Sequence, residues 1–150
     1  MSYDSTADTL DHMRKVQRNL NGFLLELLVR SEIHDNSKLE SPEKEIFDQV
    51  TPKLRGLTYG SDEYKAAIAE LGEALTHHYA NNSHHPEHYP NGVNGMSLLD
   101  VVEMFCDWKA ASERHADGDF AKSLEISRKR FGISDQLAEI FENTRRALGW

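Results

Sequence analysis

Along most of the chain, apolar residues recur every three or four positions, which is the spacing of one face of an α-helix. The first such stretch predicts a helix from about Asp8 to about Glu32, with an apolar stripe that we expect to lie in the core. The stripe consists of Met13, Val16, Leu20, Phe23, Leu24, Leu27 and Leu28. Ser41-Pro42-Glu43 is typical of a helix start, because Ser caps the first turn and Pro fits there without losing a hydrogen bond. This second helix is expected to end before Pro52.

A third helix is predicted to lead into a long loop. Ser61-Asp62-Glu63 opens this helix, and its periodicity places His78 on the inward face of the last turn. The other inward positions are Tyr64, Ala67, Ile68, Leu71 and Leu75. Residues Asn81 to Gly95 are rich in Asn, His, Pro and Gly, which predicts an irregular loop. Long loops inside compact domains are often functional, so the histidines of this loop are candidates for a site.

The last part of the chain again has helical periodicity. Ser97 and Asp100 form an acidic variant of a capping box at the start of a mostly apolar, central helix that carries Asp107. Two more helices are expected at about residues 119–130 and 134–148. The pattern as a whole predicts an all-α fold, a compact single-domain bundle of about six helices spanning residues 1–150.

Composition narrows the classes of function. The chain has 150 residues and a formal net charge of −8, and its length fits one domain. Without a basic stripe, this acidic balance argues against binding to nucleic acid or to an anionic membrane surface. The apolar run of the first helix is interrupted by Glu26 and bounded by Arg30, so no membrane-spanning segment is expected. The single cysteine, Cys106, excludes a disulfide within the chain and fits a reducing compartment, so we expect a cytoplasmic protein.

The stretch His34-Asp35-Asn36-Ser37-Lys38 is the strongest sign of chemistry in the chain. An imidazole and a carboxylate side by side suit Zn, Mn, Fe or Co better than Ca. Eight histidines in the whole chain supply further candidate ligands. The other candidate ligands are His12, His77, His78, His84, His85, His88 and Asp107.

Each histidine candidate also has an ordinary structural interpretation. The pair His34-Asp35 could simply cap the next helix. His12 could be a surface residue of an amphipathic helix, and His78 could be a hydrogen-bonded histidine of the core. His115 is expected at the surface.

The remaining candidates have similar alternatives. Asp107 shares a flank of its helix with Asp100 and Glu103, which could be a solvated acidic face. Lys38 could be a surface lysine. Cys106 is expected to be a small buried residue rather than a nucleophile, because apolar surroundings raise the pKa of a thiol.

The order of the candidates resembles a known family. His12, then His34-Asp35, then Asp107 in a later helix is similar to the HD superfamily of metal-dependent phosphohydrolases, and residues 34–38 match its HD-x-x-K form. The resemblance covers roughly residues 11–114 and extends to small HD-like proteins of bacteria and their phages. It implies a helical core in which His12, His34, Asp35 and Asp107 hold a divalent ion, either Mn, Zn, Co, Fe or Mg.

Family members that bind two metals have extra histidines between the HD pair and the last aspartate. In this chain the candidates for that part are His78 together with His84, His85 or His88. The sequence His85-Pro86-Glu87-His88-Tyr89-Pro90 is loosely similar to the cyclic-dinucleotide branch of the family, but the Gly-Tyr-Pro sequence of that branch is absent. A single-metal nucleotidase with histidines that contact phosphate is equally compatible with the pattern.

The resemblance implies hydrolysis of a phosphate ester or anhydride, often of a nucleotide, by a water whose pKa the metal lowers towards about 7. The candidate catalytic residues are then Asp35, which holds the ion, Lys38, which neutralises phosphoryl charge, and His78, which protonates the leaving oxygen. Contacts to the substrate are expected from Lys38, Arg18, His85, His88 and Arg114.

Three kinds of function therefore stay open. The leading one is a phosphohydrolase acting on a nucleotide or related small phosphoester. An inactive HD-fold module that binds metal or nucleotide and regulates a partner protein is the alternative, and an all-α interaction protein is the third. A homo-oligomer is also expected as one option, because Trp150 at the end of the chain could pack against a second copy.

Overall fold

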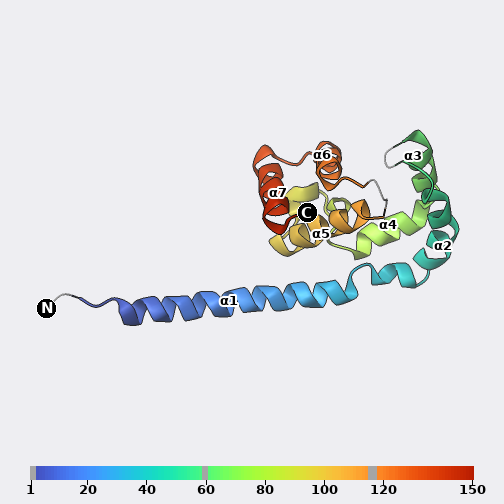
Figure 1. Cartoon of the computed structure of the whole chain (residues 1–150). Helices are drawn as coiled ribbons and strands as arrows, with labels where there is room; N and C mark the ends of the chain where they lie inside the picture. Colours follow the sequence, from blue (N-terminus) through green and yellow to red (C-terminus); the bar gives the residue numbers. More distant parts are fainter. Residues whose placement is uncertain (1–2, 59–60, 115–117) are drawn as a thin grey trace. The chain divides into compact units, whose positions relative to one another are not determined.

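A computed structural model describes residues 3–58, 61–114 and 118–150 of the chain. These residues form helices and connecting segments without a strand, which confirms the predicted all-α fold. Figure 1 shows the labelled helices α1 to α7. The chain divides into two units, Met1–His34 and Asp35–Trp150.

The first unit contains one helix, α1, which runs from Thr6 to Ile33 and confirms the predicted first helix. The prediction that its apolar stripe lies in the core is wrong. None of the residues of α1 is buried, and Leu20 and Leu28 are 59% and 60% exposed. The reason is that the described part of this unit offers no second element against which the stripe could pack.

The second unit begins with a short 3₁₀ turn and continues through six α-helices and two further 3₁₀ turns. In chain order they are η1 (Asn36–Leu39), α2 (Glu43–Leu54), α3 (Asp62–Ala69), α4 (Gly72–Asn81), η2 (Pro86–His88), η3 (Gly92–Gly95), α5 (Leu98–Ser112), α6 (Phe120–Phe131) and α7 (Asp135–Leu148). η1, α2 and α4 pack on one another, as do α5 with α6 and α6 with α7.

Two boundaries differ from the prediction. The single helix expected after Ser61 is divided into α3 and α4 at Gly72, whose φ of 43° lies in the left-handed region that interrupts an α-helix. The helix expected to end before Pro52 instead contains this proline and ends at Leu54. Pro52 lies in the last turn of α2, so the helix continues for only two residues beyond it.

The predicted caps at Ser61 and Ser97 are present, whereas the one predicted at Ser41 is not, since Pro42 is the residue before α2 and makes no side-chain cap hydrogen bond. Ser61 accepts a hydrogen bond from the backbone N–H of Tyr64, and Ser97 forms a reciprocal capping box with Asp100. At the other end of the chain, α7 stops at Gly149, whose φ of 69° is the left-handed conformation that ends many helices.

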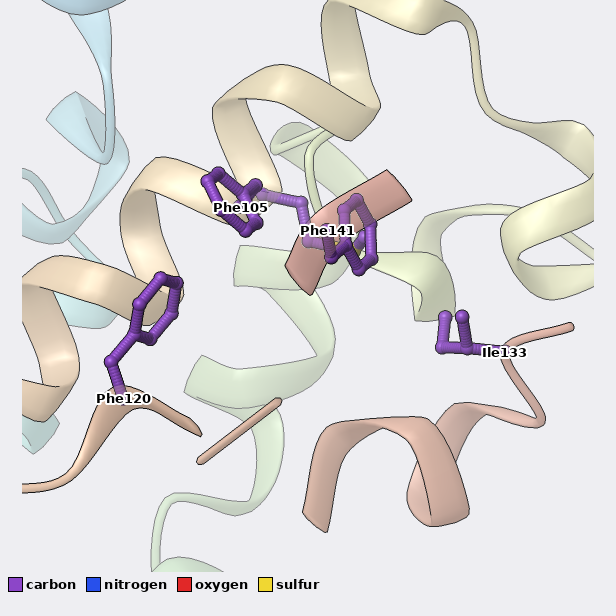
Figure 2. Close-up of a cluster of buried hydrophobic side chains, with 5 residues drawn as sticks. Phe105, Phe120, Ile133 and Phe141 are labelled. Carbon is purple, nitrogen blue, oxygen red and sulfur yellow. The ribbon is translucent and has the colours of Figure 1, made fainter. Parts of the chain in front are cut away.

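An apolar cluster joins the last three helices. Its buried members are Met104, Phe105, Phe120, Ile133 and Phe141. The ring of Phe105 lies 5.2 Å from the rings of both Phe120 and Phe141, and Phe105 and Phe141 lie side by side in Figure 2. Aromatic rings at this separation add to the stabilisation from apolar burial.

Helix α5 has two different faces. Met104 and Phe105 belong to the apolar cluster, whereas Asp100, Glu103 and Asp107 recur at spacings of three and four residues and therefore share another face. The apolar face anchors α5, so the acidic face has a fixed position. In the part of the chain that the structure describes, no helix is both long enough and apolar enough to span a membrane.

Candidate metal centre

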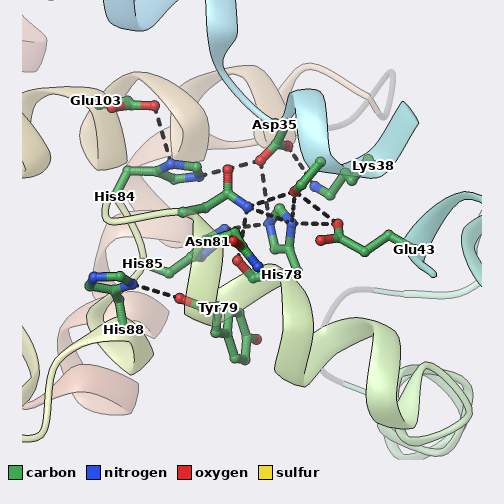
Figure 3. Close-up of polar contacts among 12 residues, drawn as sticks. Asp35, Lys38, Glu43, His78, Tyr79, Asn81, His84, His85, His88 and Glu103 are labelled. Carbon is green, nitrogen blue, oxygen red and sulfur yellow. Dashed lines mark hydrogen bonds and ion pairs between the residues drawn. The ribbon is translucent and has the colours of Figure 1, made fainter. Parts of the chain in front are cut away.

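Four side chains of the second unit bring ligand atoms together. Asp35 lies in the turn before η1, His78 lies in the last turn of α4, and His84 and His85 follow that helix. One carboxylate oxygen and one ring nitrogen of each histidine all lie within 4.8 Å of one another. Figure 3 shows the contacts of Asp35 with the rings of His78 and His84.

The local backbone explains why these residues meet. Asp35 has φ 59°, a left-handed conformation that Asp tolerates better than most residues, and it turns the chain into η1. After α4, the buried side chain of Asn82 donates hydrogen bonds to the carbonyl of His78 and to the hydroxyl of Ser37, each at 2.8 Å. Asn82 thus caps α4 and ties it to η1. The chain then turns, with the N–H of His85 bonded to the carbonyl of Asn82.

The separations between the ligand atoms match those around a single ion. Oδ1 of Asp35 lies 3.3 Å from Nε2 of His78 and 3.5 Å from Nε2 of His84, and the Nε2 atoms of His78 and His85 are 2.9 Å apart. Two atoms that each lie about 2.1 Å from a metal are separated by about 3.4 Å in a tetrahedral shell and by about 3.0 Å in an octahedral one. The residues therefore fit a divalent ion bound by three imidazoles and one carboxylate.

Two buried or half-buried glutamates hold the other nitrogen of two of these histidines. Nδ1 of His78 lies 2.9 Å from Oε2 of Glu43, and Nδ1 of His84 lies 3.1 Å from Oε1 of Glu103. His78 and His84 are 1% and 2% exposed. Metal-binding histidines commonly have a carboxylate at the nitrogen that faces away from the ion.

The pKa of His85 favours the neutral imidazole that binds metals. Burial lowers this pKa first, and the neighbouring His84 and His78 lower it further, to about 3, against the opposing charges of Asp107 and Asp35. His85 is therefore uncharged at physiological pH, and a lone pair is available on its ring.

Lys38 and Asp107 lie next to the four ligands. The ammonium group of Lys38 is 2.5 Å from Oδ2 of Asp35, the oxygen on the other side of that carboxylate, and it lies over the ring of Phe47. A carboxylate oxygen of Asp107 lies within 4.8 Å of one of Asp35. The structure thus brings Lys38 and Asp107 together with Asp35, as the sequence predicts.

The predicted ligand His12 does not fit the same site, and the predicted phosphate contact Arg18 does not fit it either. Both lie on α1, which is one continuous helix up to Ile33. At a rise of 1.5 Å per residue, His12 is about 31 Å and Arg18 about 22 Å from Ile33 along the axis. Asp35 is only two residues beyond Ile33, so neither side chain can share an ion or a substrate phosphate with Asp35 of the same chain.

The other predicted residues have various positions. His34 is the C-cap of α1 and directly precedes Asp35, and its part as a ligand stays a prediction. His88 was expected at the substrate. Its Nδ1 lies 2.8 Å from the carbonyl oxygen of Tyr79, and its ring meets the ring of Tyr89 edge to face, so these contacts are structural. Arg114 is an exposed residue after the end of α5. His115 lies outside the described residues.

The structure rules out one alternative interpretation and corrects one prediction about burial. The acidic flank of α5 is not a solvated face, because Asp100 is 2% exposed and accepts hydrogen bonds from Ser97, Ser83 and Tyr89. Cys106, expected to be buried, is exposed, and the pKa of its thiol is raised by partial burial and by the charges of Glu103 and Asp107.

Comparison with known families gives one result. A family model described as Family of unknown function (DUF5662) matches residues 1–147. The chain belongs to the DUF5662 family. The comparisons with curated proteins and with solved structures give no match.

Several residues of the centre in this DUF5662 chain were missed from the sequence. Glu43 had the appearance of an ordinary first-turn acid of α2 and Glu103 that of a surface acid, whereas His85 was predicted both as one of several candidate ligands and as a contact to the substrate. A signal for His85 exists in hindsight, because His78 ends a helix and His84-His85 follow its capping residue Asn82. For Glu43 and Glu103 there is no local signal, since their partners are far away in the sequence.

Proposed function

We propose that Asp35, His78, His84 and His85 bind one divalent transition-metal ion and that the chain is a metal-dependent phosphohydrolase of a nucleotide or related small phosphoester. The observation that carries the proposal is the convergence of three ring nitrogens and one carboxylate oxygen within 4.8 Å. The predicted ligands His34 and Asp107 are not among these four residues.

The electrostatics of the cluster favour a cation at its centre. Nδ1 of His78 and Nδ1 of His84 both face carboxylates, which can only accept hydrogen bonds. In the neutral rings the lone pairs are therefore on the Nε2 atoms, which face Oδ1 of Asp35. Acceptor atoms directed at one another are stabilised by a positive charge between them.

Hydrolysis is supported by the surroundings of this cluster and by the resemblance to the HD superfamily. When bound, a divalent ion acidifies a water ligand and so supplies a nucleophile at neutral pH. Lys38 adds a positive charge beside Asp35, where it can attract the phosphoryl oxygens of a substrate and stabilise the charge that develops on them. Lys38 binds Oδ2 of Asp35, which leaves Oδ1 of this carboxylate directed at His78 and His84.

A closed metal site is the second candidate function, and the number of ligands favours it. Four protein ligands fill a tetrahedral shell, as in structural zinc sites, whereas catalytic sites keep a position open for water. A six-coordinate ion such as Mn²⁺ would leave two positions open with the same four residues. Under the second candidate, the chain binds metal to stabilise its fold or to regulate a partner, without turnover.

The test is product analysis by chromatography after incubation with a mixture of nucleoside mono-, tri- and cyclic phosphates and with Mn²⁺, Co²⁺, Zn²⁺ or Mg²⁺. Asp35→Asn is the informative variant, because Asn keeps the shape of Asp and also tolerates the left-handed backbone at this position. Asp48→Asn, at an exposed position of α2, is the matched control. Metal-dependent loss of one substrate with the wild type and the control, but not with Asp35→Asn, is the expected result. Metal binding without turnover of any phosphate would favour the closed site.

A further inference from the structure

Glu43 is not one of the proposed ligands. Among the described acids of the second unit it is the most deeply buried. Its side chain is 0% exposed. An isolated carboxylate at such a position would be strongly unfavourable, so Glu43 must be compensated by donors. It accepts from Nδ1 of His77 at 2.7 Å, from Nδ1 of His78 at 2.9 Å and from the hydroxyl of Ser37 at 3.0 Å.

The contacts of Glu43 are those of an acceptor, because its two carboxylate oxygens face the hydroxyl of Ser37 and a ring nitrogen of each of His77 and His78. The proton of a neutral His78 ring must therefore lie on Nδ1, and Nε2 presents its lone pair to Asp35 and His85.

Glu103 has the same relation to His84. Nδ1 of His84 faces Oε1 of Glu103 at 3.1 Å, and Nε2 faces Oδ1 of Asp35 at 3.5 Å. The two glutamates come from different helices, α2 and α5, and approach the cluster from different sides, as Figure 3 shows. The same arrangement, in which a glutamate faces Nδ1 and Asp35 faces Nε2 of a histidine, thus occurs twice, and the two glutamates are far apart in the sequence.

We infer that Glu43 and Glu103 are positioning residues of the metal centre, which fix the proton of His78 and His84 on Nδ1 and so keep both Nε2 atoms ready for a divalent ion. This inference rests on the proposed metal site. Groups that orient a ligand in this way typically change metal affinity by about 10- to 100-fold when they are altered. Because each glutamate also brings a negative charge close to the ion, replacement by the neutral isostere Gln weakens binding from both causes.

The experiment uses the full chain and has two measurements. The first is the dissociation constant for Co²⁺, followed by its visible absorption spectrum, for the wild type, Glu43→Gln and Glu103→Gln. Glu45→Gln and Glu113→Gln replace exposed glutamates, in the first turn of α2 and at the end of α5, and serve as controls on the same two helices. We expect about 10- to 100-fold weaker binding in the two buried-site variants and wild-type binding in the two controls.

The second measurement is the ¹⁵N NMR spectrum of histidine in the metal-free chain, at a pH at which its imidazoles are neutral. The wild type should carry the proton of His78 on Nδ1, and Glu43→Gln should show a larger share of the Nε2–H form. A purely structural role of Glu43 would leave this tautomer unchanged. Unchanged Co²⁺ affinity in both variants, or a wild-type His78 with its proton on Nε2, overturns the inference. A wild type that binds no metal contradicts the proposed function instead, and the tautomer then decides the role of Glu43 by itself.

Discussion

The apolar cluster around Phe105 and the polar cluster around His78 are both buried, and α5 contributes side chains to each. The apolar cluster depends on area and shape, since burial of apolar surface has no preferred direction. In the polar cluster each member depends on a particular partner, because a buried charge or imidazole without its hydrogen bonds is strongly unfavourable. The comparison teaches that one helix can stabilise the fold with one face and prepare a binding site with the other.

The largest expected effect is on the apolar side of this comparison. Phe105→Ala should lower the free energy of unfolding by about 3–5 kcal/mol, because it removes a buried ring that contacts Phe120, Phe141 and Trp150. Urea denaturation measures this loss. Cys106→Ala, an exposed position on the same helix, is the control and should stay within about 0.5 kcal/mol of the wild type. If the folded fraction of Phe105→Ala also loses its affinity for Co²⁺, then metal binding depends on the packing of the apolar face of α5, and the separation of the two faces is contradicted.

Addition of a metal should have a somewhat smaller effect, on the polar side only. At a free metal concentration of 100 times the dissociation constant, binding raises the free energy of unfolding by about 2.7 kcal/mol, and a chelator reverses this gain. His85→Ala should weaken the response, because one of the four ligands is lost. His12→Ala should keep it, because α1 places His12 too far from Asp35. Thermal unfolding with and without Co²⁺ measures both variants, and a lost response in His12→Ala would contradict the assignment of ligands.

Asp100 sharpens the comparison, because it holds the start of α5 through hydrogen bonds instead of apolar contacts. Burial raises the pKa of Asp100, but its hydrogen bonds from Ser97, Ser83 and Tyr89 lower it by more, so the net pKa lies well below the ordinary value. Its stabilising contribution is therefore complete above about pH 4 and is lost as the pH falls further. We expect Asp100→Asn to lower the free energy of unfolding by about 1–3 kcal/mol at pH 7 and by less at pH 2–3. Urea unfolding across this range measures the gap between variant and wild type, and a gap independent of pH would contradict an ionised Asp100.

The sequence was a good guide to helices and caps, because these depend on neighbouring residues. The spacing of apolar positions predicted α1, α5, α6 and α7, and Ser61 and Ser97 marked helix starts that the structure confirms. It failed at Gly72, because the surrounding sequence does not reveal whether a glycine continues a helix or adopts the positive φ that divides it. It also failed for the stripe of α1, because periodicity reveals an apolar face and cannot reveal what covers it.

For the candidate centre, the sequence indicated Asp35, Lys38, His78, His84 and Asp107, which the structure brings together. It could not choose among the loop histidines, because His84, His85 and His88 differ only in how the turn after α4 directs them. The roles of Glu43 and Glu103 could not be predicted, because each glutamate contacts a distant histidine. His78 is 35 positions from Glu43, and His84 is 19 positions from Glu103. Long-range hydrogen bonds of this kind leave no local pattern.

The most direct test of the central claim is metal K-edge X-ray absorption spectroscopy of the full chain loaded with one equivalent of Co²⁺ or Zn²⁺. The account predicts a first shell of nitrogen and oxygen at about 2.0–2.2 Å, with the multiple-scattering pattern of three imidazole rings. Loss of one imidazole from this pattern in His85→Ala would assign the ligand. A shell of oxygen atoms alone, or one with fewer than two imidazoles, would contradict the proposed centre.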